Sequence, residues 1–295
     1  MHGKWLTVMA LLVGIALVSS TTAFAAHGEK REAKKAILIA AFGTTVPDAQ
    51  KALDKVESSV KQAFPGVEVR WGYTSRIVRN KLAKEGKVLD SPEKAMVKLM
   101  DEGFTHVAVL SLHTIPGVEF HNLMRNAHLF GQLEGGFDKI LVAWPLLSSH
   151  EDHVRAAKAM LKNIPASRKP QDAVVLMGHG SEKHPSDAIY AAMSQVFSDL
   201  DPNVHVATVE GYPGIEDVMA KLEAKKIKKV YLIPFMAVAG DHAMNDMAGS
   251  EPDSWKSQLT KKGIACEAVM KGTAEYPEIV DIWLDHLKTV FAHFD

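Results

Sequence analysis

The sequence contains a single cysteine, Cys266, among its 295 residues. One cysteine cannot form an internal disulfide, and no C-x-x-C-H motif is present to attach a c-type haem covalently. The formal net charge is −1, so the chain lacks the basic excess that is typical of nucleic-acid-binding proteins. It also lacks the G-x-x-x-x-G-K-[ST] motif, which disfavours an ATP-driven enzyme.

The apolar run nearest the N-terminus, Leu6 to Val18, indicates export rather than a membrane anchor. It follows Lys4 and precedes the small-x-small sequence Ala23-Phe24-Ala25. This order is typical of a secretory signal peptide, and a run of this length is short for a stable membrane span. We therefore expect residues 1–25 to be a cleaved signal peptide and the mature protein to be periplasmic.

Buried strands alternate with amphipathic helices along the rest of the chain. In its first part the apolar runs predict strands at 36–42, 67–73, 105–112 and 139–144. Helical spacing predicts a helix over 47–64, and Ser91-Pro92-Glu93 is typical of the start of another. A further helix runs through Leu161, and the polar stretch 165–172 reads as a linker.

The order of motifs then repeats after this linker, which indicates an internal duplication. AILIAAFGTT matches VVLMGHGS, and EVRWGYTSRIV matches VATVEGYPGIEDV. IPGVEFHN matches VAGDHAMN, so that Gly117 corresponds to Gly240 and Glu119 to His242. Alternating strands and helices favour parallel sheets covered on both faces. We predict two similar doubly wound α/β domains, residues 26–165 and 166–295, facing a central cleft, with the last helix packing back on the first domain.

Three polar residues follow predicted strands of the second half. They are His179, Glu210 and His242, and His179 lies between two glycines in Gly178-His179-Gly180. The carboxyl ends of parallel strands meet at one edge of a sheet, where such folds place their ligands. Two imidazoles and a carboxylate suit a divalent first-row metal, so the sequence predicts a metal site here. Glu210 has a second interpretation, as a residue that satisfies amides of its own turn.

The corresponding positions of the first half predict a different wall. Thr44 or Thr45, Trp71 and Glu119 make it apolar and hydroxylic with one carboxylate, and set an aromatic ring opposite the metal. Glu119 has an alternative role as a helix cap near Phe120. We interpret Tyr73 and Tyr212 as packing residues at the sheet edge. We interpret most of the following histidines, which lie between the first helix and the linker, as solvated: His113, His121, His128, His150 and His153.

The motifs MGHGS, VEGYP and AGDHAMNDMAG, in this order and spacing, resemble those of the class II tetrapyrrole chelatases. SLHTIPGVEFHNL and GTAEYPEIVDIWLDHL extend the likeness over nearly the whole mature chain. The chain looks most like the CbiK-type anaerobic sirohydrochlorin cobaltochelatases of cobalamin synthesis. This resemblance implies a two-domain fold and insertion of Co(II) into sirohydrochlorin. It implies that His179 and His242 are metal-binding and catalytic, that Glu210 completes the metal site, and that Glu119 is an acidic residue across the cleft.

The predicted signal peptide departs from that family pattern and keeps other functions open. They are a sirohydrochlorin ferrochelatase, since the same ligands accept Fe(II), and a periplasmic metal- or tetrapyrrole-binding protein without turnover. His121 and His128 lie seven residues apart, about two helical turns, so either is a candidate ligand for a noncovalent b-type haem. We also expect a homo-oligomer, and neither a nucleic-acid partner nor a stable membrane span.

Overall fold

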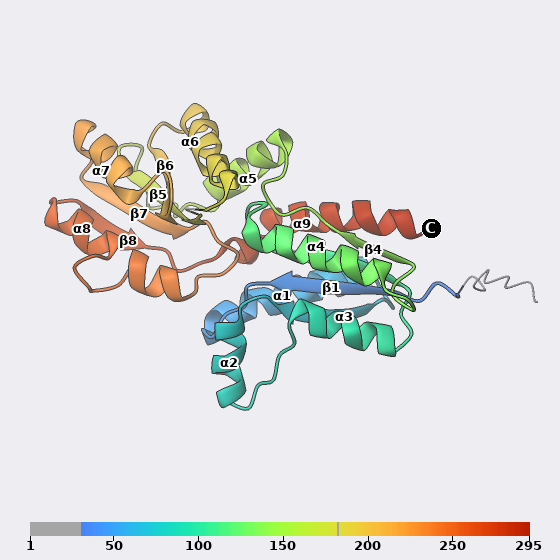
Figure 1. The fold of residues 1–295 in the computed structure, drawn as a ribbon. Helices are drawn as coiled ribbons and strands as arrows, with labels where there is room; N and C mark the ends of the chain where they lie inside the picture. The colour runs from blue at the N-terminus through green and yellow to red at the C-terminus, as the bar shows by residue number, and fades with distance from the viewer. Residues whose placement is uncertain (1–30, 182) are drawn as a thin grey trace, which may run out of the picture. The chain divides into compact units, whose positions relative to one another are not determined.

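A computed structural model describes residues 31–181 and 183–295, so the predicted signal peptide lies outside the described residues. Residues Glu32–Asp295 form one compact unit with two parallel sheets of four strands each (Figure 1). The strand order is β2-β1-β3-β4 in the first sheet and β6-β5-β7-β8 in the second, which confirms the predicted duplicated α/β fold. The strands are β1 (Lys35–Ala41), β2 (Glu68–Tyr73), β3 (His106–Ser111), β4 (Lys139–Val142), β5 (Ala173–Gly180), β6 (Val204–Glu210), β7 (Lys229–Pro234) and β8 (Ala265–Ala268).

Helices connect these strands as the sequence pattern indicates. The first begins at the predicted residue because Pro47 occupies its first turn, and the third because the Ser91 hydroxyl accepts from the Lys94 N–H. The α-helices are α1 (Pro47–Ala63), α2 (Arg76–Lys84), α3 (Pro92–Asp101), α4 (Val118–Gln132), α5 (His150–Lys162), α6 (Ala188–Leu200), α7 (Ile215–Ala224), α8 (Trp255–Lys261) and α9 (Pro277–Phe291). Short helical turns lie at Pro185–Asp187, Ala243–Met247, Thr273–Glu275 and Ala292–Phe294.

Alternate residues of the central strands bury opposite faces of each sheet. In β1, Ile37 and Ile39 pack with residues of α1 and α9, whereas Leu38 packs with residues of α3 and α4. In β5, Leu176 packs with α6 and Val175 with α7 and α8. Both faces of both strands are apolar because each sheet is covered on both sides, as expected for parallel sheets.

One hydrophobic core runs through both halves of the chain. Ile37 of the first sheet and Leu176 of the second belong to the same cluster of buried side chains. The last helix, α9, packs against α1, β3 and β4 of the first half and against α5, and its Trp283 is fully buried in this cluster. Across 31–181 and 183–295, no helix combines the length and apolar character that a membrane crossing requires.

The first half carries an additional helix that the sequence pattern did not predict. Helix α2 lies between β2 and α3, whereas in the second half β6 leads directly to α7. Most side chains of α2 are polar, and Ile77 is 70% exposed. The helix therefore lacks the strong apolar stripe from which we predict helices. Because α2 is inserted after β2, the helix of the first half that takes the place of α7 is α3, the second helix after the strand.

Candidate active site

His179 reaches the edge of the second sheet through a backbone turn that requires glycine. Gly180 has φ +80°, and a Cβ atom at this position would lie 1.6 Å from the carbonyl oxygen of Glu210. Only glycine allows this left-handed conformation and this close approach without strain. The half-buried His179 ring is therefore held at the carboxyl end of β5, as the sequence predicts.

His242 reaches the same place from the segment that follows β7. The N–H of Met244 donates to the carbonyl of Gly240 (3.1 Å), which begins a helical turn at the glycine that precedes His242 by two residues. The centroids of the His179 and His242 rings are 4.9 Å apart, and the rings meet edge to face. The structure thus brings together the two histidines that the duplication predicts to be neighbours.

Hydrogen bonds at Nδ1 orient both imidazoles in the same way. His179 Nδ1 lies 3.0 Å from the Gly180 carbonyl oxygen, and His242 Nδ1 lies 2.5 Å from Asp246 Oδ2. Both partners are acceptors, so we assign the ring hydrogen to Nδ1 in each neutral imidazole. This leaves both Nε2 atoms with a lone pair for a metal, the arrangement that metal-binding histidines commonly have.

Glu210 lies on the neighbouring strand with its side chain exposed. It pairs with Gly180 across the β5–β6 ladder. Within the ranges that the structure describes, however, no group of three or more His, Cys, Asp or Glu side chains is arranged to hold a metal ion. The role of Glu210 as a third ligand therefore stays a prediction.

Glu119 lies in the first turn of α4 and takes the same position in its half as His242 in the other. The N–H of His121 donates to the carbonyl of Gly117 (3.0 Å), which repeats the turn that begins at Gly240. Burial of the Glu119 carboxyl raises its pKa, and the electrostatic influence of the nearby His179 ring acts in the opposite direction. Because the side chain remains 48% exposed, this carboxyl lies in crowded surroundings yet is open to a ligand.

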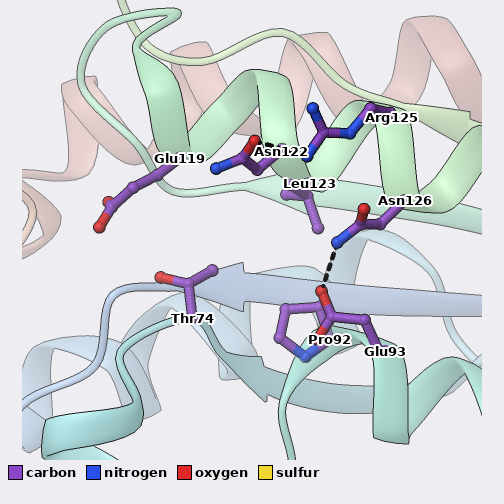
Figure 2. Close-up of a pocket in the computed structure, with 8 residues that line it drawn as sticks. All are labelled: Thr74, Pro92, Glu93, Glu119, Asn122, Leu123, Arg125 and Asn126. Atoms are coloured by element: carbon purple, nitrogen blue, oxygen red, sulfur yellow. Dashed lines mark hydrogen bonds between the residues drawn. The ribbon is translucent and has the colours of Figure 1, made fainter. Parts of the chain in front are cut away.

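A hollow of about 380 Å³ lies beside Glu119 in the first half (Figure 2). Figure 2 shows Glu119 and Arg125 on helix α4, with Thr74 and Pro92 across from them. Arg125 donates to Asn122 Oδ1 at 3.0 Å, so its guanidinium is held at the wall of this hollow. The hollow is therefore lined by Glu119 and other residues of the first half, and not by His179 or His242.

The loops of the two halves approach each other next to these residues. A Cβ atom on Gly240 would lie 3.9 Å from Thr44 Oγ1, in the loop after β1. A Cβ atom on Gly117 would lie 3.7 Å from the hydroxyl oxygen of Ser186, in the short helical turn Pro185–Asp187 that follows β5. The strand ends of both halves thus border one region, with imidazoles from one half and a carboxylate from the other.

The aromatic residue of the first wall is not the one that we predicted. Trp71 pairs with Ile39 inside the sheet, and its indole N–H donates to Glu57 of α1, so its ring faces the core layer. Phe42 instead follows β1 immediately, is 45% exposed, and precedes Gly43, whose φ is +92°. It therefore corresponds to His179, which likewise precedes a glycine of positive φ.

Two further interpretations need correction. Tyr73 is buried as predicted, but Tyr212 is 62% exposed and is not a packing residue, because it lies in a loop beyond the end of β6. His113 is not solvated: its side chain is 9% exposed, and burial lowers its pKa to about 4. No sequence signal distinguishes it from the other histidines, since its burial depends on the packing of the segment that follows β3.

The two candidate haem ligands of α4 lie in different surroundings. His121 is partly buried, its Nδ1 donates to the Gly117 carbonyl (2.9 Å), and its ring lies 5.0 Å from that of His184. His128 is exposed, and its Nε2 lies 2.9 Å from the side-chain nitrogen of Gln132. His121 therefore keeps Nε2 for a ligand, whereas His128 has that nitrogen engaged.

Comparison with solved structures finds proteins of similar fold. SirB from Bacillus subtilis, solved with Fe³⁺, is similar with a TM-score of 0.56 at 16% identity, over 88% of this chain and 96% of that one. CbiX, described as the terminal enzyme for biosynthesis of siroheme in denitrifying bacteria, has a TM-score of 0.55 at 17% identity, over 86% and 98%. At these identities the likeness concerns the fold alone.

Sequence comparison is more specific. The family model described as cobalt chelatase (CbiK) matches residues 35–292, and this chain belongs to that family. The sirohydrochlorin cobaltochelatase CbiKC of Nitratidesulfovibrio vulgaris is 43% identical over 89% of this chain and 92% of its own length. The sirohydrochlorin cobaltochelatase of Salmonella typhimurium is 34% identical over 86% and 95%. The family predicted from the motifs is thereby confirmed.

Proposed function

We propose that this protein inserts Co(II) into sirohydrochlorin without ATP. The observation that carries this proposal is the paired orientation of His179 and His242, whose Nδ1 atoms are engaged and whose Nε2 atoms are left for a metal. Two relatives that are 43% and 34% identical and are named sirohydrochlorin cobaltochelatase support the choice of metal and macrocycle.

The donor set accounts for the protons as well as the metal. Insertion of one Co(II) into the macrocycle releases two pyrrolic N–H protons. Transfer of the metal frees the Nε2 lone pairs of His179 and His242, which then accept these two protons, because imidazole takes up protons near neutral pH. Glu119 faces this exchange from the other half, and its raised pKa makes it a better proton acceptor than an ordinary carboxylate.

The first wall supplies the surface for the macrocycle. The exposed ring of Phe42 is suited to contact an aromatic macrocycle, and Arg125 is suited to pair with a peripheral carboxylate. Sirohydrochlorin carries many such carboxylates. Binding of the macrocycle is therefore assigned mainly to the first half and binding of the metal to the second.

His179→Ala and His242→Ala test this proposal. Each variant should fold, since a side chain at the sheet edge contributes little to the core, and each should lose at least about 100-fold in insertion rate, the usual contribution of an acid–base group. The measurement is the absorbance change of sirohydrochlorin with Co(II), Fe(II) or Ni(II) in turn, with circular dichroism as a check on folding. The matched control is His150→Ala, an exposed histidine at the start of α5, which should insert cobalt at the parent rate. Parent-rate insertion by either site variant would contradict the assignment.

Export and haem binding extend the proposal. We place the mature start at Ala26 in the periplasm, on the signal-peptide pattern of residues 1–25; an intact mass that includes Met1 would overturn this.

We also propose that His121 binds a noncovalent b-type haem, because its Nδ1 hydrogen bond leaves Nε2 for an axial bond. The haem would be shared between subunits of a homo-oligomer. A Soret band that survives His121→Ala unchanged would contradict this assignment.

A further inference from the structure

His113 is a buried histidine with one ring nitrogen that has no hydrogen-bond partner. It follows β3 by two residues, and its Nδ1 lies 2.7 Å from the hydroxyl oxygen of Ser111, which is fully buried. Its Nε2 is also buried, and among the described residues it makes no hydrogen bond. A buried polar atom without a partner costs free energy, so its retention at this position calls for an explanation.

We assign the Ser111 hydroxyl as the donor to Nδ1 of His113, and this assignment decides where the ring hydrogen lies. Burial lowers the pKa of His113 to about 4, so the ring is neutral at pH 7 and carries one ring hydrogen. A hydroxyl that donates to Nδ1 leaves that hydrogen on Nε2. The buried Nε2 is then a donor that still lacks its acceptor.

The acceptor nearest in chemistry is the carboxylate of Glu119. His113 Nε2 lies 3.6 Å from Glu119 Oε2, which is longer than a hydrogen bond. A small rotation of the half-exposed Glu119 side chain closes this gap, and catalytic hydrogen bonds commonly tighten when substrate binds. The two residues lie on either side of the turn that ends at Gly117, so one loop sets their separation.

We propose that His113 is a positioning residue for Glu119, whose Nε2–H holds one carboxylate oxygen and leaves the other for the cleft. Ser111, on β3, anchors the imidazole, so the carboxylate is tied through two side chains to a central strand of the first sheet. The proposal rests on the proposed function, in which Glu119 serves the insertion of the metal.

Two substitutions separate this role from simple packing. His113→Leu replaces the imidazole with an apolar side chain of similar size and so removes the donor. We expect the insertion rate constant kcat to fall about 10- to 100-fold while the affinity for Co(II) stays unchanged. His113→Gln restores an amide N–H near the same place and should recover most of the rate. An unchanged kcat in His113→Leu, or equal losses in the leucine and glutamine variants, would overturn the proposal.

A double-mutant cycle with Glu119 decides whether the two residues act together. In the Glu119→Gln background, His113→Leu should cause little further loss, since the group that it positions is already gone. A full further loss would show that His113 acts independently of Glu119. If His113→Leu fails to fold by circular dichroism, Ser111→Ala replaces it, with a smaller loss expected and the same cancellation by Glu119→Gln.

An infrared measurement keeps this test independent of turnover. The Glu119 carboxylate band, obtained as the difference between the spectra of the parent and Glu119→Gln, should shift in His113→Leu, whereas His150→Ala should leave it unchanged. A shift in a protein that inserts no cobalt would retain the positioning role and refute the proposed function. An unshifted band in His113→Leu would refute the positioning role, whatever the activity.

Discussion

At the scale of single residues, Asp246 orients the imidazole ring of His242. Its carboxylate accepts the Nδ1 hydrogen of His242 at 2.5 Å, from one helical turn further along the chain. Asp246→Ala removes this acceptor, so that neither the tautomer nor the orientation of the His242 ring is fixed any longer. We expect the affinity for Co(II) to fall about 10- to 100-fold, as is usual when a histidine ligand loses its outer partner.

Titration calorimetry with Co(II) measures this effect. Asp241→Ala removes an equal charge beside His242, from an exposed residue, and serves as the matched control. It should retain nearly the parent affinity if orientation rather than charge is responsible. Equal losses in the two variants would contradict the orienting role.

The sequence predicted the neighbouring pair of histidines but not the residues that support them. His179 and His242 were predictable because each lies near a glycine after a strand, at matched places of a duplicated pattern. Asp246 left a local signal, since four residues separate it from His242 on a helical turn. His113 left none, because its burial and its approach to Glu119 depend on tertiary packing. Trp71 was wrong as the cleft aromatic because its side chain contacts Glu57 of α1, and this tertiary contact leaves no signal in the sequence.

At the scale of the elements, strand β6 carries a buried histidine that makes stability depend on pH. Burial and then the positive charges of Lys225 and Lys221 lower the pKa of His205 to about 4, while Asp201 acts in the opposite direction. The unfolded chain, with an ordinary pKa of 6.5, takes up a proton between about pH 6.5 and 4 that the folded protein does not. The free energy of unfolding should therefore decrease as the pH falls through this window, by roughly 3 kcal/mol in total from this residue.

His205→Leu should remove this contribution. Urea unfolding at pH 7 and pH 5 should show a smaller loss of stability in the variant than in the parent. The variant should still lose some stability, because both proteins retain a second acid-sensitive group, His113. His150→Ala, at an exposed site, should match the parent at both pH values. An equal loss in His205→Leu and the parent would show that β6 is not the source.

The elements themselves were largely predictable because each strand is an apolar run and most helices carry an apolar stripe. The lengths of β1, α1 and β3 agree with the predicted ranges to within one or two residues. Helix α2 escaped prediction because its side chains are mostly polar and it buries only Leu82. It has no counterpart in the second half, so the duplication, which guided the other assignments, gave no indication of it.

At the scale of the whole molecule, the shared core joins the stability of the two halves. Trp283 of α9 is fully buried in the cluster that also contains Ile37 of the first sheet and Leu176 of the second. Trp283→Ala leaves a large cavity at this junction and should lower the free energy of unfolding by about 3–5 kcal/mol. Because one cluster supports both sheets, hydrogen exchange in Trp283→Ala should show β1 and β5 losing protection together. The control is Ile77→Ala, on the exposed face of α2, which should change the free energy of unfolding by no more than about 0.5 kcal/mol. If β1 alone loses protection in Trp283→Ala, the two halves unfold as separate units and the core that joins them contributes little to their cooperation.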